Sequence, residues 1–173
     1  MKQLRSLSVI IVSCILLSCQ KDVIQDEELS NNLSMAANSN QEKELPFKGT
    51  YITSSEILQP PPFLQTRITG AGNASHLGNS SFVAVSSLNF TTPPPFQLGG
   101  TATFTAANGD EIYTSFTGTA TPNQDGSLNV SMVHIITGGN GRFQHASGNF
   151  SGFSVATPGH SEGSIAHEGI ISY

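Results

Sequence analysis

The chain has 173 residues, a formal net charge of −5 and only 11% charged residues. Its seven basic residues form no cluster, so an acidic chain of this kind repels the phosphate backbone, which excludes nucleic acid as a partner. Both cysteines, Cys14 and Cys19, lie close to the N-terminus, so the rest of the chain has neither a disulfide framework nor a thiol nucleophile.

Residues 1–18 have the features of an export signal. Lys2 and Arg5 form a basic head, and a mainly apolar run follows over residues 7–17. This run is shorter than the roughly 20 residues that a membrane-spanning helix requires. A basic head, a short apolar run and small residues at its end together predict a signal peptide.

The segment 16–19, Leu-Leu-Ser-Cys, resembles the lipobox of bacterial lipoproteins. In that family the cysteine is acylated and becomes the new N-terminus, so the resemblance implies a lipid anchor on Cys19. Gln20 stands where enterobacterial lipoproteins retained in the inner membrane have aspartate, which favours the outer membrane and leaves its periplasmic and surface faces open. A Cys14–Cys19 disulfide is the alternative.

Residues 19–45 differ in composition from the rest of the chain. They contain six acidic residues and two lysines, and they lack glycine and aromatic residues. Such a segment buries too little apolar surface to fold, so we expect a mostly disordered tether. All seventeen glycines lie in residues 46–173, which predicts a single folded domain there.

Residues 46–173 alternate between apolar and polar side chains, and turn signals separate the alternating runs. Residues 110–121 and 128–136 show a period of two, and Asn108-Gly109 is a strong hairpin signal. We expect an all-β domain, an eight-stranded antiparallel up-and-down β-barrel, with a β-sandwich as the alternative. The predicted strands cover about 47–58, 64–74, 80–90, 99–107, 110–121, 127–137, 148–156 and 163–172.

The segment 138–148 carries a distinctive glycine motif. Its residues Gly138, Gly139, Gly141, Phe143 and Gly148 match the pattern GGxGxFxxAxG and resemble the signature of allene oxide cyclases and plant dirigent proteins. The resemblance implies their eight-stranded barrel and makes a trimer conceivable. No catalytic residue of those families aligns here through a matching motif, so none is transferred. Physically, the glycines permit positive φ and close approach, and Phe143 would anchor the turn in the core.

A proline-rich repeat occurs at 60–63 and 93–96, Pro-Pro-Pro-Phe in both copies. In an up-and-down meander these loops are the first and third connections, so both would border the same mouth of the barrel. Stiff loops would hold Phe63 and Phe96 in place at little entropic cost. We expect the two rings either to plug this mouth or to form an apolar lip for a ligand, and the plug is favoured.

Few polar residues on the predicted strands are candidates for the barrel lumen. Glu56, Glu111 and Tyr113 are the plausible polar lining, although a solvent-facing position is favoured for each of them. His134 lies on an apolar face and is interpreted as a hydrogen-bonded core histidine.

Three further motifs are interpreted as having no catalytic, metal-binding or phosphate-binding role. Residues 159–163 spell G-x-S-x-G, but no helical pattern follows, so we expect a turn rather than a hydrolase nucleophile. The histidines lack the spacing of a metal site, and the convergence of His160, Glu162 and His167 near the last turn is the alternative. The glycines of 138–141 precede neither a helix nor a Lys-Ser/Thr pair, which excludes a phosphate loop. No catalytic residue, metal or cofactor is predicted.

The sequence therefore predicts a lipid-anchored envelope β-barrel with membrane lipid as one partner. Two functions are weighed. The first is non-catalytic, either structural or binding a small apolar ligand. The second is a cyclase- or isomerase-like enzyme acting on a small hydrophobic substrate in the lumen. The small number of ionisable residues favours the non-catalytic function, because general acid–base catalysis needs positioned titratable groups.

Overall fold

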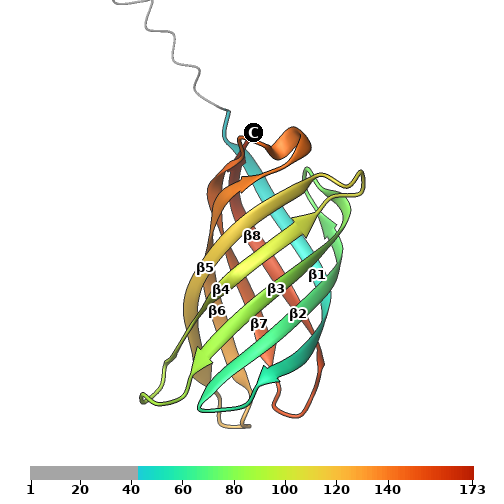
Figure 1. Cartoon of the computed structure of the whole chain (residues 1–173). Coiled ribbons are helices and arrows are strands. Elements are labelled where there is room, and N and C mark those ends of the chain that lie inside the picture. The colour runs from blue at the N-terminus through green and yellow to red at the C-terminus, as the bar shows by residue number, and fades with distance from the viewer. Residues whose placement is uncertain (1–42) are drawn as a thin grey trace, which may run out of the picture. The chain divides into compact units, whose positions relative to one another are not determined.

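The computed structural model describes residues 43–173, which form a closed antiparallel barrel (Figure 1). Each strand pairs with the next, and β8 closes the ring by pairing with β1. The predicted signal peptide, Cys19 and nearly all of the predicted tether lie outside the described residues. The elements are β1 (Leu45–Gln59), β2 (Phe63–Ala74), β3 (Gly78–Asn89), β4 (Phe96–Thr105), β5 (Glu111–Pro122), β6 (Leu128–Gly139), the short 3-10 helix η1 (Gly141–Phe143), β7 (Ser147–Ala156) and β8 (Glu162–Ser172).

The predicted all-β class and the eight-stranded up-and-down barrel are confirmed, and a β-sandwich is excluded. The alternating pattern explains the fold, because successive side chains of a strand point to opposite faces. In β6, Met132, His134 and Ile136 are buried in the lumen, whereas Val133 and Ile135 between them are exposed on the outer surface. Closing the sheet on itself removes both edges that an open sheet would expose.

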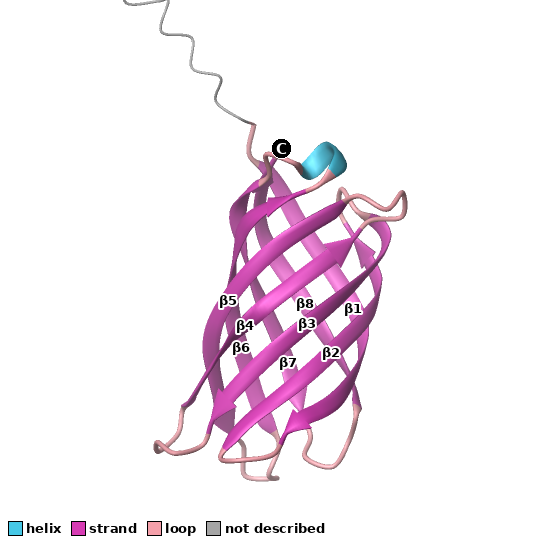
Figure 2. Cartoon of the chain, in the orientation of Figure 1, coloured by secondary structure: helices cyan, strands magenta, loops and turns pink. Residues whose placement is uncertain are grey.

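The barrel has two unlike ends (Figure 2). We call the end that carries η1, the start of β1 and the end of β8 the helix end. The other, which we call the proline end, carries the four turns at 60–62, 90–95, 123–127 and 157–161. The two proline-rich loops therefore border the same mouth, as the meander predicted.

The half of the lumen nearest the helix end is filled with aromatic side chains. Phe47, Tyr51, Phe104, Phe143 and Phe150 are each at most 1% exposed. The rings of Phe47 and Phe150 lie with their centroids 4.6 Å apart, and those of Phe104 and Phe150 lie 5.5 Å apart. This half is therefore a packed core.

Within residues 43–173, no helix is long and apolar enough to cross a membrane.

The glycine motif closes the helix end. Gly138 adopts φ 136° where the β5–β6 register shifts by one residue, and Gly141 adopts φ 56° at the start of η1. Both values lie in the region that glycine populates most readily. Phe143 is fully buried, and its ring centroid lies 4.8 Å from that of Tyr173. The expected anchoring of this turn by Phe143 is confirmed.

Substituting Gly139 with alanine is expected to destabilise the barrel. An added Cβ would lie 2.2 Å from the backbone oxygen of Glu111 and 2.7 Å from that of Phe143, and backbone atoms cannot move aside cheaply. We expect the free energy of unfolding to fall by about 2 kcal/mol, measured by chemical denaturation. Gly163→Ala is the matched control, because its Cβ would approach only the Thr53 hydroxyl, at 3.3 Å. Equal losses for both variants would contradict the steric argument.

Residues 43–173 contain a complete folding unit. All eight ladder pairings and the aromatic core lie inside this segment. Because no strand edge is left unpaired, we expect the segment to fold on its own, and the experiments below use it.

Candidate functional site

The half of the lumen nearest the proline end is hollow. It contains a cavity of about 420 Å³ that opens between the proline-end turns. Aliphatic side chains from several strands line its walls, and these residues are only partly buried because the space between them is open. They include Ile68, Leu88, Leu128, Val130 and Ile165.

Small side chains on β1 to β3 explain why this half is not filled. Thr53 and Ser55 follow Tyr51 on the inward face of β1, and Ala84 and Ser86 follow Phe82 on that of β3. The aromatic residues that fill the helix half are thus replaced by hydroxyl and methyl groups toward the mouth. The change of side-chain size along β1 and β3 contributes to the cavity.

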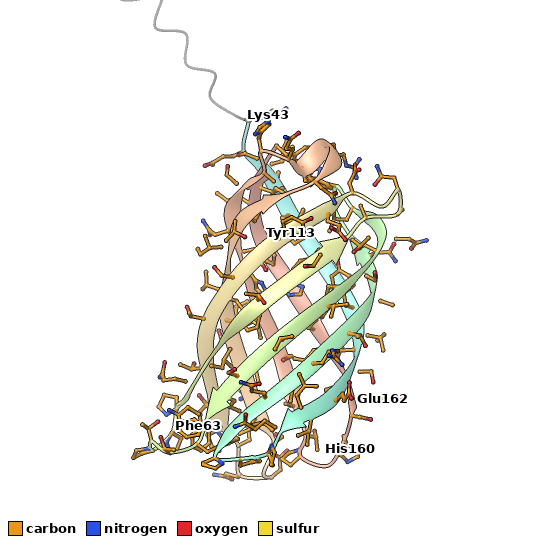
Figure 3. All side chains as sticks on the ribbon, in the orientation of Figure 1. Lys43, Phe63, Tyr113, His160 and Glu162 are labelled. Atoms are coloured by element: carbon orange, nitrogen blue, oxygen red, sulfur yellow. The ribbon has the colours of Figure 1, made fainter. Side chains whose placement is uncertain are left out.

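The mouth is bordered by Pro61, Phe90 and the turn at 157–161. Phe96 lies beside this border, where its ring packs against Phe90 with the centroids 4.7 Å apart. The expectation that both repeat phenylalanines plug the mouth is wrong for Phe63, which is 52% exposed (Figure 3). The neighbouring Leu64 points into the cavity, so strand alternation directs Phe63 outward.

Two histidines lie at the floor of the cavity, where it meets the aromatic core. His134 of β6 and His167 of β8 are 2% and 3% exposed, and their ring centroids are 5.2 Å apart. His134 stacks on Phe150 at 4.7 Å, with an interplanar angle of 13°. Met132 and Phe116 complete the floor around them.

The floor histidines are largely unpartnered. Nδ1 of His134 lies 3.0 Å from the Thr114 hydroxyl, so the expected hydrogen-bonded core histidine is present. Within residues 43–173, however, Nε2 of His134 and both ring nitrogens of His167 have no hydrogen-bond partner. A buried polar group left without a partner costs about 1–3 kcal/mol of stability. The two histidines therefore place polar ring nitrogens at the floor that packing alone does not require.

Burial keeps both imidazoles neutral. Burial, with a smaller contribution from the neighbouring His167, lowers the pKa of His134 from 6.5 to about 3. Burial likewise lowers the pKa of His167 from 6.5 to about 4. At neutral pH each ring is therefore uncharged, with one nitrogen that donates a hydrogen bond and one that accepts.

The acidic and phenolic candidates do not reach the lumen. Glu56 points outward and pairs with Arg67, with 3.0 Å between their nitrogen and oxygen atoms. Tyr113 donates a 2.8 Å hydrogen bond to the Glu111 carboxylate on the outer surface, and this bond raises the pKa of the Tyr113 phenol. Tyr113 therefore faces solvent, the favoured of the two expectations, and the lumen alternative is wrong for Glu111 and Tyr113, because Ile112 and Thr114, which alternate with them, occupy the inward face.

The remaining histidines lie apart from the floor. His160 is exposed in the last proline-end turn, so it does not converge with the buried His167 (Figure 3). In the part of the chain that the structure describes, no three His, Cys, Asp or Glu side chains are grouped to hold a metal ion. Residues 159–163 form a turn and the start of β8, not a strand-to-helix elbow.

Sequence reasoning missed the pairing of His167 with His134. The signal was present, because His167 alternates with Ile165 and Ile171 on one face of the last strand and His134 does the same with Met132 and Ile136. The register of β7 brings the two rings together, because His134 pairs with Phe150 and His167 pairs with Gly152, two residues further along the same strand.

Comparison of the chain with known proteins adds no relative: no family model, no curated protein and no solved structure matches it.

Proposed function

We propose that this protein binds a small apolar ligand in the open half of its barrel without changing it chemically. The observation that carries the proposal is the cavity of about 420 Å³, bounded mainly by aliphatic walls and bordered by proline-end turns. Its volume falls within the range of roughly 300–1,000 Å³ that is typical of small-molecule sites. An eight-stranded barrel is just wide enough to hold one such ligand.

We further propose that the protein works at the outer membrane, held there by lipid on Cys19. The basic head, the apolar run and the Leu-Leu-Ser-Cys segment at 16–19 support this anchor. A relationship to the allene oxide cyclase and dirigent barrels is also proposed, on the glycine motif of 138–148 and its place in a closed meander.

A second candidate is a cyclase- or isomerase-like enzyme, and the unpartnered Nε2 of His134 at the cavity floor favours it. A general base works best when its pKa lies near the working pH. The pKa of His134 is about 3 and that of His167 about 4, so both are weak bases. The site is therefore better suited to holding a ligand than to removing a proton from one.

Filling the cavity is expected to abolish binding. Ser86 points into the cavity, and the adjacent Ser87 is exposed on the outer surface of the same strand. We expect segment 43–173 to bind the fluorescent apolar probe N-phenyl-1-naphthylamine, one molecule per barrel. Ser86→Phe should weaken this binding by about tenfold or more, which corresponds to a loss of at least about 1.4 kcal/mol.

Ser87→Phe is the matched control, because it adds the same ring one residue away on the opposite face. It should leave probe binding unchanged. Absence of probe binding by the unmodified segment, or an equal loss in both variants, would contradict a binding site in the lumen.

A further inference from the structure

The cavity floor differs chemically from its walls. The walls present aliphatic side chains and a few hydroxyls, whereas the floor presents two imidazoles with unpartnered nitrogens. The neighbouring rings, Phe82, Phe104 and Phe150, show that the barrel tolerates apolar residues at this depth. Polar rings at positions 134 and 167 therefore indicate a requirement other than packing, namely a polar group on the bound ligand.

The hydrogen bonds around Thr114 assign the proton of His134. The Thr114 hydroxyl donates to the backbone oxygen of Ala102 at 3.4 Å, which uses its single proton. The same oxygen lies 3.0 Å from Nδ1 of His134, and it accepts a hydrogen bond from Nδ1–H in the tautomer that satisfies both contacts. In a neutral ring this leaves Nε2 of His134 as an acceptor, and His167 adds one donor and one acceptor.

The charges of the barrel argue against an ionic head group. Lys48, Arg67 and Arg142 pair with Glu168, Glu56 and Asp110, none of which lines the cavity. Lys43 lies exposed at the helix end, away from the cavity (Figure 3). Among the described residues that line the cavity, the sole carboxylate is Glu162 at the mouth. A carboxylate or phosphate at the floor would be desolvated without a counter-charge, which is costly.

Building on the proposed binding function, we propose that the ligand is an uncharged apolar alcohol whose hydroxyl reaches the cavity floor. The hydroxyl donates a hydrogen bond to Nε2 of His134, and its oxygen accepts a hydrogen bond from the N–H of the neutral His167 ring. The hydrocarbon body of the ligand lies along Leu88, Leu128 and Ile165. A hydroxyl fits because it both donates and accepts, as the two rings together require.

Two isomers of equal size test the hydroxyl. 1-Octanol and 1-methoxyheptane have the same molecular formula, but the ether cannot donate a hydrogen bond. In displacement of N-phenyl-1-naphthylamine from segment 43–173 at pH 7.5, we expect 1-octanol to bind about five- to tenfold more tightly than the ether. Octanoate should bind most weakly of the three.

The variants separate the floor from the outer surface. In His134→Leu the preference for octanol over the ether should disappear while the ether binds as before. His145→Leu, at an exposed position between η1 and β7, should retain the preference. If a floor variant does not fold, the ring nitrogen resonances of His134 and His167 in the unmodified segment give the answer, because octanol should shift them and the ether should not shift Nε2 of His134.

The outcomes are distinguishable. Failure of every compound, including the probe, would overturn the proposed binding function itself. Equal affinity for octanol and ether, a preference that survives His134→Leu, or tightest binding of octanoate would overturn the alcohol and leave apolar binding in place.

Discussion

Phe104→Ala is expected to lower the free energy of unfolding by about 4 kcal/mol, the typical cost of truncating a buried phenylalanine. Phe104 is 1% exposed at the centre of the aromatic core. Its ring centroid lies 5.3 Å from that of Phe82, 5.5 Å from that of Phe150 and 5.4 Å from that of His167. Removing the ring deletes all of these contacts and leaves a void that β-sheet backbone cannot collapse to fill. Denaturant titration of segment 43–173, followed by circular dichroism, measures the loss.

Phe153→Ala is the matched control for this prediction. Phe153 is 54% exposed on the outer surface of β7, so the same truncation removes little buried area. We expect a loss below about 1 kcal/mol. A comparable loss for both variants would show that the aromatic core is not the main source of stability.

Acidification is expected to destabilise the barrel through the floor histidines. The pKa of His134 is about 3 and that of His167 about 4 in the folded barrel, against 6.5 for an ordinary histidine. Below pH 6.5 the unfolded chain therefore binds protons that the folded barrel does not. The stabilising contribution is complete above pH 6.5 and is lost as the pH falls toward the folded pKa values. At about 1.4 kcal/mol per pKa unit, His167 alone accounts for roughly 3 kcal/mol between pH 6.5 and 4.

His167→Leu isolates this effect from the titration of surface carboxylates. The variant removes one titrating imidazole and its unpartnered nitrogens, so its free energy of unfolding should fall less steeply with acid than that of the unmodified segment. At pH 7 the variant should be at least as stable as the unmodified segment, because an apolar side chain replaces a polar one that had no partner. His160→Leu, at an exposed position, should keep the full pH dependence. An unchanged slope in His167→Leu would show that this ring is already protonated or solvated in the folded barrel.

The sequence predicted the fold well because closure of an up-and-down meander needs only local signals. Alternation in β5 and β6, the Asn108-Gly109 hairpin and the two proline triplets were enough to place all eight strands within a few residues. The sharing of one mouth by both proline loops followed from the order of the connections alone.

The site was less accessible to sequence reasoning, because it depends on which face of each strand is inward and on which strands meet. Glu111 and Tyr113 were considered as lining, although the apolar Ile112 on the opposite face already indicated the inward side. The cavity itself depends on which inward residues lie at equal depth, because Ser86 pairs with Thr66 near the mouth whereas Phe82 pairs with Phe104 in the core. Such a comparison between strands requires the register, which alternation along a single strand does not give.

The chain enters the barrel at Leu45 on the helix end, while the lumen opens at the proline end. The first residues of β1 and the mouth of the cavity therefore lie at opposite ends of the barrel. Substitutions in the four proline-end turns can alter access to the cavity without changing the residues where the described chain enters the barrel.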